Sequence, residues 1–220
     1  MLSVRQVYLG SHRKEDLLAN GISEAFTIAV YFLLCRELGE PPLFPGNENI
    51  WTSFYQKSYA PGIADLAIFA ATHEHCANEA FNHNNGDRTF WPKIAAYWGR
   101  EVSIRSGNIP SPEPKFENMK KDSNSLVLGL DLIEWLKDKQ EVWDRIVEKY
   151  GGKREAFIWA SWDHLNWAMG RAVTTLLSLD KARKFGWTRY DSTYESWVSA
   201  FKTMQVAGIL PNRRHLDSKE

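Results

Sequence analysis

The most apolar stretch of the chain, AFTIAVYFLLC at 25–35, is followed at once by two charged residues. It is too short to cross a bilayer, so it predicts a helix that is buried in the protein core. We expect this helix to cover 23–38, because Gly39 can end it and the two prolines after Glu40 cannot continue it. The stretch LFPGNENIW at 43–51 then predicts a short strand followed by a turn.

The next part of the chain combines a helical pattern with a strand and a turn. At 63–75, in IADLAIFAATHEH, apolar residues recur as they do on a helix with a broad buried face. The short segment EAFNH after it is bounded by polar turn residues, as a buried strand would be, and NNGD predicts a turn in which Gly86 can adopt a positive φ. Asp87 or Thr89 could cap the helix that WPKIAAYWG predicts up to Gly99.

The second half of the chain is predicted to be helical after one interruption. Residues 103–125 carry three prolines among polar residues, which predicts a loop or an insertion and the one candidate for an internal boundary. Three helical stretches follow, each of which ends near a glycine: 125–151, 157–186 and 192–208. No element is predicted for 1–19, and 212–220 form a polar tail.

Composition narrows the function mainly by exclusion. The chain has 220 residues, and its 27 Lys and Arg balance its 27 Asp and Glu, so no net charge favours nucleic acid or an anionic membrane as a partner. Two cysteines cannot form a disulfide framework, and the amino-terminal segment lacks the apolar run of a secretory signal. We therefore expect a cytoplasmic protein that binds neither nucleic acid nor membranes. Its 10 Trp, 8 Tyr and 11 Phe fill a core or line a pocket for a bulky apolar ligand.

The densest group of reactive side chains lies in ATHEHCANEAFNHNNGD, at 71–87. A zinc site on a helix needs ligands three or four residues apart, but His73 and His75 are two apart and point about 200° away from each other. Cys76 could share a face with His73, yet no second cluster supplies further ligands, and His83 lies in the predicted strand. The pattern favours the exposed end of a helix with one small buried thiol, and a metal-binding protein ranks last among the alternatives.

Other catalytic patterns are missing from the sequence. The GxSxG nucleophile motif and the GxxxxGK[ST] phosphate loop are both absent. His164 follows Asp163 inside a predicted helix, where adjacent side chains diverge, so the two do not form a catalytic pair. Spacing alone therefore assigns no catalytic residue.

The strand end AFNHNNGD, at 80–87, and the helix predicted after it resemble the (F/Y)N-x-x-NG motif of extended short-chain dehydrogenases/reductases. The longer segment NEAFNHNNGDRTFWPKIAAYWG resembles more specifically the family of progesterone 5β-reductase and iridoid synthase, with its relatives in fungal biosynthetic gene clusters. Three further segments resemble that family in the same order: AVYFLLCRELGEPPLFPG, IADLAIFAATHEHCANEAFN and DKARKFGWTRYDSTYESWVSAF. The resemblance runs over about 20–211.

The resemblance implies an α/β fold, with a partial doubly wound (Rossmann-type) sheet and a mostly helical substrate-binding cap. In that family a Gly-rich GxxGxxG loop binds NADP and a YxxxK pair does the acid/base work, and both lie upstream of the matched part. Neither motif occurs in this chain. We therefore expect residues 20–211 to be the carboxyl-terminal part of such an enzyme, lacking its amino-terminal nucleotide-binding half, and we assign no catalytic residue.

The family's chemistry implies an NADPH-dependent reduction of an enone or carbonyl in a small apolar metabolite, in secondary metabolite biosynthesis. Four residues are candidates for substrate binding, and the last of them matches an aromatic position near the substrate in the family: Trp51, Asn84, Trp187 and Tyr190. An ordinary structural role is the alternative for each of them. The alternative for the whole chain is a truncated, non-catalytic remnant or binding module that keeps the substrate cap. Such a chain would form a homo-oligomer or pair with an intact homologue.

Overall fold

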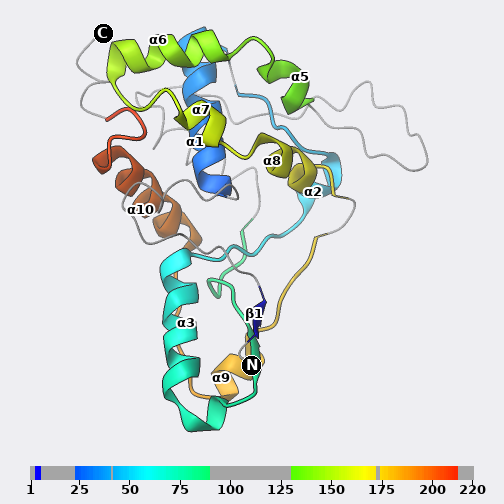
Figure 1. Cartoon of the computed structure of the whole chain (residues 1–220). Helices are drawn as coiled ribbons and strands as arrows, with labels where there is room; N and C mark the ends of the chain where they lie inside the picture. The colour runs from blue at the N-terminus through cyan, green and yellow to red at the C-terminus, as the bar shows by residue number, and fades with distance from the viewer. Residues whose placement is uncertain (1–2, 6–22, 41, 90–129, 172–173, 213–220) are drawn as a thin grey trace.

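The computed structural model describes residues 3–5, 23–40, 42–89, 130–171 and 174–212, and for 3–5 it describes the backbone only. Helices dominate this part of the chain (Figure 1). The elements in chain order are β1 (Ser3–Arg5), α1 (Glu24–Leu38), α2 (Glu48–Thr52), α3 (Ala60–Thr72), the 3-10 turn η1 (Glu74–Cys76), β2 (Ala80–Asn82), α5 (Leu132–Leu136), α6 (Gln140–Tyr150), α7 (Ala156–Trp159), α8 (Trp162–Met169), α9 (Asp180–Lys184) and α10 (Thr193–Val206). None of the described helices is long and apolar enough to span a membrane.

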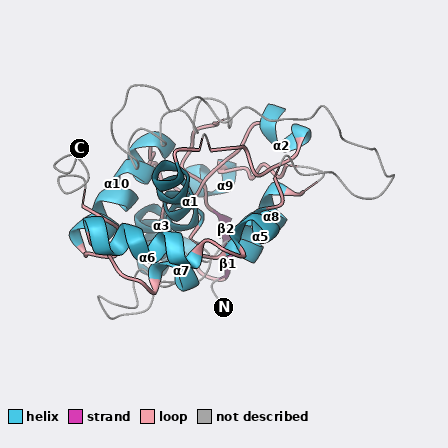
Figure 2. Cartoon of the chain, turned by 90° about the horizontal axis from the view of Figure 1, so that it is seen from above, coloured by secondary structure: helices cyan, strands magenta, loops and turns pink. Residues whose placement is uncertain are grey.

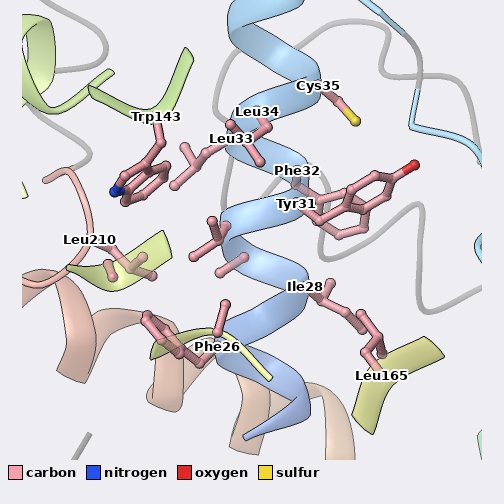
Figure 3. Close-up of a cluster of buried hydrophobic side chains, with 14 of the residues drawn as sticks. Phe26, Ile28, Tyr31, Phe32, Leu33, Leu34, Cys35, Trp143, Leu165 and Leu210 are labelled. Carbon is pink, nitrogen blue, oxygen red and sulfur yellow. The ribbon is translucent and has the colours of Figure 1, made fainter. Parts of the chain in front are cut away.

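The helix α1 forms the centre of the larger hydrophobic core. Residues 26–35 are all buried, so α1 is apolar on every side and is surrounded by other helices, as Figure 2 shows from above. Trp143 of α6 approaches it on one side and Leu165 of α8 on the other (Figure 3). Both ends are capped: the Ser23 side chain accepts a hydrogen bond from the Phe26 N–H, and Gly39 adopts a left-handed φ of 68°. The prediction of a buried helix over 23–38 is confirmed.

A smaller core lies at the other end of the molecule, where α3 and α9 pack beside the two strands (Figure 1). β1 and β2 pair in parallel, with Val4 opposite Phe81. Phe81 is 2% exposed and packs with Leu66 of α3 and Ala182 of α9, whereas Ala80 on the opposite face of β2 is exposed. The described residues thus contain a two-stranded parallel sheet that is covered on the Phe81 face. The doubly wound sheet remains a prediction.

The other predictions for the first half of the chain have mixed outcomes. The helix at 63–75 is confirmed as α3, which begins earlier and ends at Thr72. The strand is confirmed as β2, and so is the turn after it, in which Gly86 has a φ of 95°. The short strand predicted at the start of 43–51 is wrong, because the chain is irregular there until α2 begins at Glu48. Asn47 caps α2 by accepting from the Ile50 N–H at 2.9 Å, and its Nδ2 donates to the carbonyl of Arg171 at 3.0 Å.

The carboxyl-terminal stretches are helical but more divided than predicted. The described part of 125–151 contains α5 and α6, and 157–186 contains most of α7 together with α8 and α9, with an irregular segment at 174–179. The stretch 192–208 is the single helix α10. The glycines that were expected to end these stretches all have positive φ values: Gly151, Gly186 and Gly208. The predicted helix up to Gly99, the loop at 103–125, and most of 1–19 and 212–220 lie outside the described residues.

Candidate functional site

The carboxyl end of β2 is where the fold brings distant polar segments together. Because β1 and β2 are parallel, their carboxyl ends lie at the same edge of the sheet, and ligands of open α/β sheets bind outside such an edge. Residues 83–87 follow β2 and contact both the first turn of α3 and the segment 187–193. We refer to these three pieces of chain together as the β2 edge.

Two asparagines hold the turn of the β2 edge in place. Asn84 is 3% exposed, its Nδ2 donates to the carbonyl of Leu177 at 2.8 Å, and its Oδ1 accepts from the Gly86 N–H at 2.8 Å. Asn85 is 1% exposed, and its Oδ1 accepts from the Tyr59 N–H at 2.7 Å. Its Nδ2 donates to Thr193 Oγ1 at 3.0 Å. Both amides are therefore used to fix backbone segments.

The backbone of Asn85 extends the same connections. Its N–H donates to the carbonyl of Lys57 at 2.8 Å, and its carbonyl accepts from the Asp191 N–H at 2.9 Å. The ammonium of Lys57 in turn bonds both carboxylate oxygens of Glu24, at 2.7 and 2.6 Å. Since Glu24 lies in the first turn of α1, the β2 edge is tied directly to the larger core.

Asp87 connects the turn to the start of α10. Its Oδ2 accepts from the Thr193 N–H at 2.7 Å, and its Oδ1 accepts from the Thr193 hydroxyl at 2.6 Å. A carboxylate at the amino terminus of a helix is favoured by the helix dipole. The helix that Asp87 or Thr89 was expected to cap lies outside the described residues, and the structure shows Asp87 bound at the start of α10.

A mixed aromatic and charged cluster lies behind the turn. His83 is fully buried, and its ring lies 5.5 Å from that of Trp187, whose indole N–H donates to Asp65 Oδ2 at 2.8 Å. Arg189 donates through Nε and Nη2 to the two oxygens of Asp191, at 2.9 and 3.0 Å. This bidentate pair raises the pKa of Arg189. Burial lowers the pKa of His83 from 6.5 to about 4; Arg189 also lowers it, whereas Asp191 and Asp65 act in the opposite direction.

Gly62, in the first turn of α3, allows this cluster to close. A Cβ at this position would lie 2.6 Å from Asp191 Oδ2 and 2.8 Å from His83 Nε2. Both distances are shorter than van der Waals contact, so any larger residue would displace one of the two side chains. The missing side chain of Gly62 therefore lets His83 and Asp191 approach each other across α3.

The structure brings three of the four predicted substrate-binding residues to the β2 edge. Asn84 and Trp187 are buried there, and Tyr190 is 61% exposed, with its ring 2.9 Å from where a Cβ on Gly86 would lie. Trp51 instead packs in the larger core, with its ring 4.8 Å from that of Phe44. The substrate role of all four remains a prediction.

His83 is the residue of this site that the sequence pattern does not single out, because in the sequence it is one more histidine beyond reach of the others. Its position two residues after Phe81 carried the signal, since alternate residues of an extended segment face the same side. Phe81 was already expected to be buried. His83 therefore belonged on the buried face.

The other histidines of this region lie at the far end of α3. His73 and His75 are exposed, and each forms a 2.8 Å hydrogen bond with a backbone carbonyl, of Phe69 and Phe185 respectively. Cys76 is completely buried. The prediction of an exposed helix end with one buried thiol is confirmed. Within the described part of the chain, no three His, Cys, Asp or Glu side chains are grouped so that they could hold a metal ion.

Comparison with known proteins shows which sequences this chain resembles. No protein-family model matches the chain. The chain is 39% identical over 197 residues to the short chain dehydrogenase gsfE of Penicillium aethiopicum, a match that covers 87% of this chain and 50% of that protein. It is 30% identical to an (S)-8-oxocitronellyl enol synthase of Antirrhinum majus, over 84% of this chain and 44% of the synthase. It is 27% identical to a 3-oxo-Delta(4,5)-steroid 5-beta-reductase of Arabidopsis thaliana, over 82% of this chain and 43% of the reductase.

The sequence similarity to short-chain dehydrogenases and to enol synthase and 5β-reductase proteins is thus confirmed, at 24–39% identity. The chain spans about half the length of the curated relatives it matches.

Proposed function

We propose that the chain takes part in an oxidoreduction of the short-chain dehydrogenase/reductase type. The reaction would be an NADPH-dependent reduction of an enone or carbonyl in a small apolar metabolite, in secondary metabolite biosynthesis. The observation that carries this proposal is the 39% identity to a short chain dehydrogenase over 87% of the chain. The proposal includes a cytoplasmic location and a place for this chain as the carboxyl-terminal part of a doubly wound fold.

The described residues do not fit the pyrophosphate of NADP. Such a site needs free N–H groups in a Gly-rich turn between a strand and the start of a helix. After β2, the N–H groups of Asn85 and Gly86 already donate to the Lys57 carbonyl and to Asn84 Oδ1. The cofactor site would therefore come from residues outside the described part or from a partner chain.

The β2 edge suits the substrate side of such a reaction. Tyr190 is exposed there, on a segment whose neighbours are fixed by hydrogen bonds, so an apolar ligand could pack against a ring that is already positioned. Trp187 and Asn84 would support that surface from behind. Trp51 would act only through the larger core in which it packs.

A second candidate function is a non-catalytic binding module that pairs with an intact homologue or with another copy of itself. It is favoured by exposed apolar side chains on two elements of the smaller core: Ile68 of α3 is 65% exposed, and Ala80 of β2 is exposed on the face opposite Phe81, which no described helix covers. Parallel sheets are normally covered on both faces, so this face suits a protein partner.

One titration separates the two candidates. The purified chain is titrated with NADPH while the cofactor fluorescence is followed, and an apolar enone is then added while NADPH consumption is measured. Saturable binding followed by consumption supports the reductase. No binding at high cofactor concentration refutes autonomous catalysis, and size-exclusion chromatography with an intact homologue then tests the pairing.

A further inference from the structure

His83 combines complete burial with an absence of polar partners for its ring among the described residues. Its exposed fraction is 0%, and neither ring nitrogen forms a hydrogen bond with a described residue. Only the neutral imidazole is compatible with such a position, because a charged ring would need a hydrogen-bond acceptor or water. The main chain around it is well fixed, since its carbonyl accepts from the Ser58 hydroxyl at 2.9 Å.

The described charges that face His83 come from two elements. Asp65 lies on α3, and Arg189 and Asp191 lie on the segment after α9. Asp191 Oδ2 and His83 Nε2 both border the space above Gly62, which makes this carboxylate the closest candidate partner for a protonated ring. Asp191 is already bound by Arg189 through two hydrogen bonds, however, so a shift of its carboxylate toward His83 would strain that pair.

The segment that carries Asp191 is attached at its two ends, and between them Arg189 also contacts α3 through the Pro61 carbonyl and Asp65, whereas Thr188 and Tyr190 are exposed. The Trp187 N–H donates to the Ala182 carbonyl at 3.0 Å, and the Asp191 N–H donates to the Asn85 carbonyl at 2.9 Å. Tyr190 lies between these attachments. A rearrangement of Asp191 would therefore move Tyr190 while α9 and α10 keep their own internal hydrogen bonds.

We propose that neutral His83 positions the segment from Trp187 to Asp191 against α3, and Tyr190 with it, and that protonation of the imidazole releases this segment. His83 is thus a positioning residue. The relevance of Tyr190 to a substrate rests on the proposed function, but the positioning itself does not.

The direction of the pH effect follows from the environment of His83. The pKa of the ring is about 4 in the closed state, against 6.5 when the ring is free, so the closed state has its full stability above pH 6.5 and loses it as the pH falls toward 4. Between pH 7 and pH 5, the ratio of closed to released segment should fall about twentyfold.

Hydrogen exchange read by mass spectrometry tests this at the level of the segment. The chain is exchanged at pH 7 and pH 5, with rates corrected for intrinsic chemistry, and peptides covering 187–191 are compared with peptides of α6. The His83→Leu and His83→Phe variants remove the proton site, and His164→Gln on α8 is the matched control. We expect 187–191 to open about twentyfold more often at pH 5 in the wild type and the control, but equally at both pH values in the His83 variants.

Three results would overturn the proposal. The segment could open equally in the wild type at both pH values, α6 could open together with it, or an apolar His83 variant could keep the acid response. Loss of the fold in both apolar variants at pH 7 would also count against it, since a ring without hydrogen bonds should be replaceable by an apolar side chain. The measurement needs neither cofactor nor substrate, so its outcome is independent of the proposed reductase activity.

Discussion

Replacing Gly62 with Ala should destabilise the protein, although Ala is the better helix former. A Gly→Ala change inside a helix stabilises by about 1 kcal/mol on propensity alone. Here the new Cβ would lie 2.6 Å from Asp191 Oδ2 and 2.8 Å from His83 Nε2. Neither side chain can retreat freely, because the Asp191 side chain is 14% exposed and paired with Arg189, and His83 is fully buried.

Overpacking a fitted site by one methyl group costs about 1–3 kcal/mol, and the two contacts below 3.0 Å place the cost here in the upper part of that range, above the gain in propensity. We therefore expect Gly62→Ala to lower the free energy of unfolding by about 1–2 kcal/mol, measured by urea denaturation followed by circular dichroism. The control is the same change in an Asp191→Ala background, where the closest atom is removed and part of the loss should disappear, while the contact with His83 remains. A Gly62→Ala protein as stable as the wild type, or more stable, would refute the contact geometry of the β2 edge.

Three further substitutions test other parts of the fold. Asn47→Ala should lower the free energy of unfolding, measured by urea denaturation, by about 2 kcal/mol. The change removes a fully buried amide that caps α2 and donates to the Arg171 carbonyl, so an unchanged midpoint would contradict that role. Trp143→Ala should lower the free energy of unfolding by about 3–5 kcal/mol, since the indole is fully buried against α1. A loss as small as that of a surface substitution would show that the core is arranged differently. Gly86→Ala should cost about 1 kcal/mol or more because its φ is 95°, and it should displace the Tyr190 ring, which a change in the fluorine NMR signal of a labelled Tyr190 would report.

Helices whose burial follows from their own apolar residues could be predicted from the sequence. The run at 25–35 is apolar on every side and is followed by Gly39, so both the burial and the end of α1 could be inferred without knowledge of its partners. The strand β2 was predicted from a short apolar segment between turn residues, and the positive φ of Gly86 from the Asn-Gly pair.

The errors arise where a side chain acts over a long distance. The pattern at 43–51 predicts a short strand and then a turn that includes Asn47, whereas the Asn47 side chain caps α2 and donates to the Arg171 carbonyl. The importance of His83 was missed because its surroundings are supplied by α3 and by the segment after α9, which are separate in sequence. No spacing rule within 71–87 could bring Trp187 or Asp191 next to it.

The hydrogen bonds of Asn85 also bear on the chemical lifetime of the chain. Asn-Gly is the dipeptide most prone to deamidation, in which the backbone nitrogen of Gly86 attacks the side-chain carbonyl carbon of Asn85. In the folded protein that nitrogen donates to Asn84 Oδ1, and the Asn85 amide is held by Tyr59 and Thr193. The reaction therefore requires the turn to open first. The rate of Asn85 deamidation in the purified protein would therefore report how often the turn of the β2 edge opens.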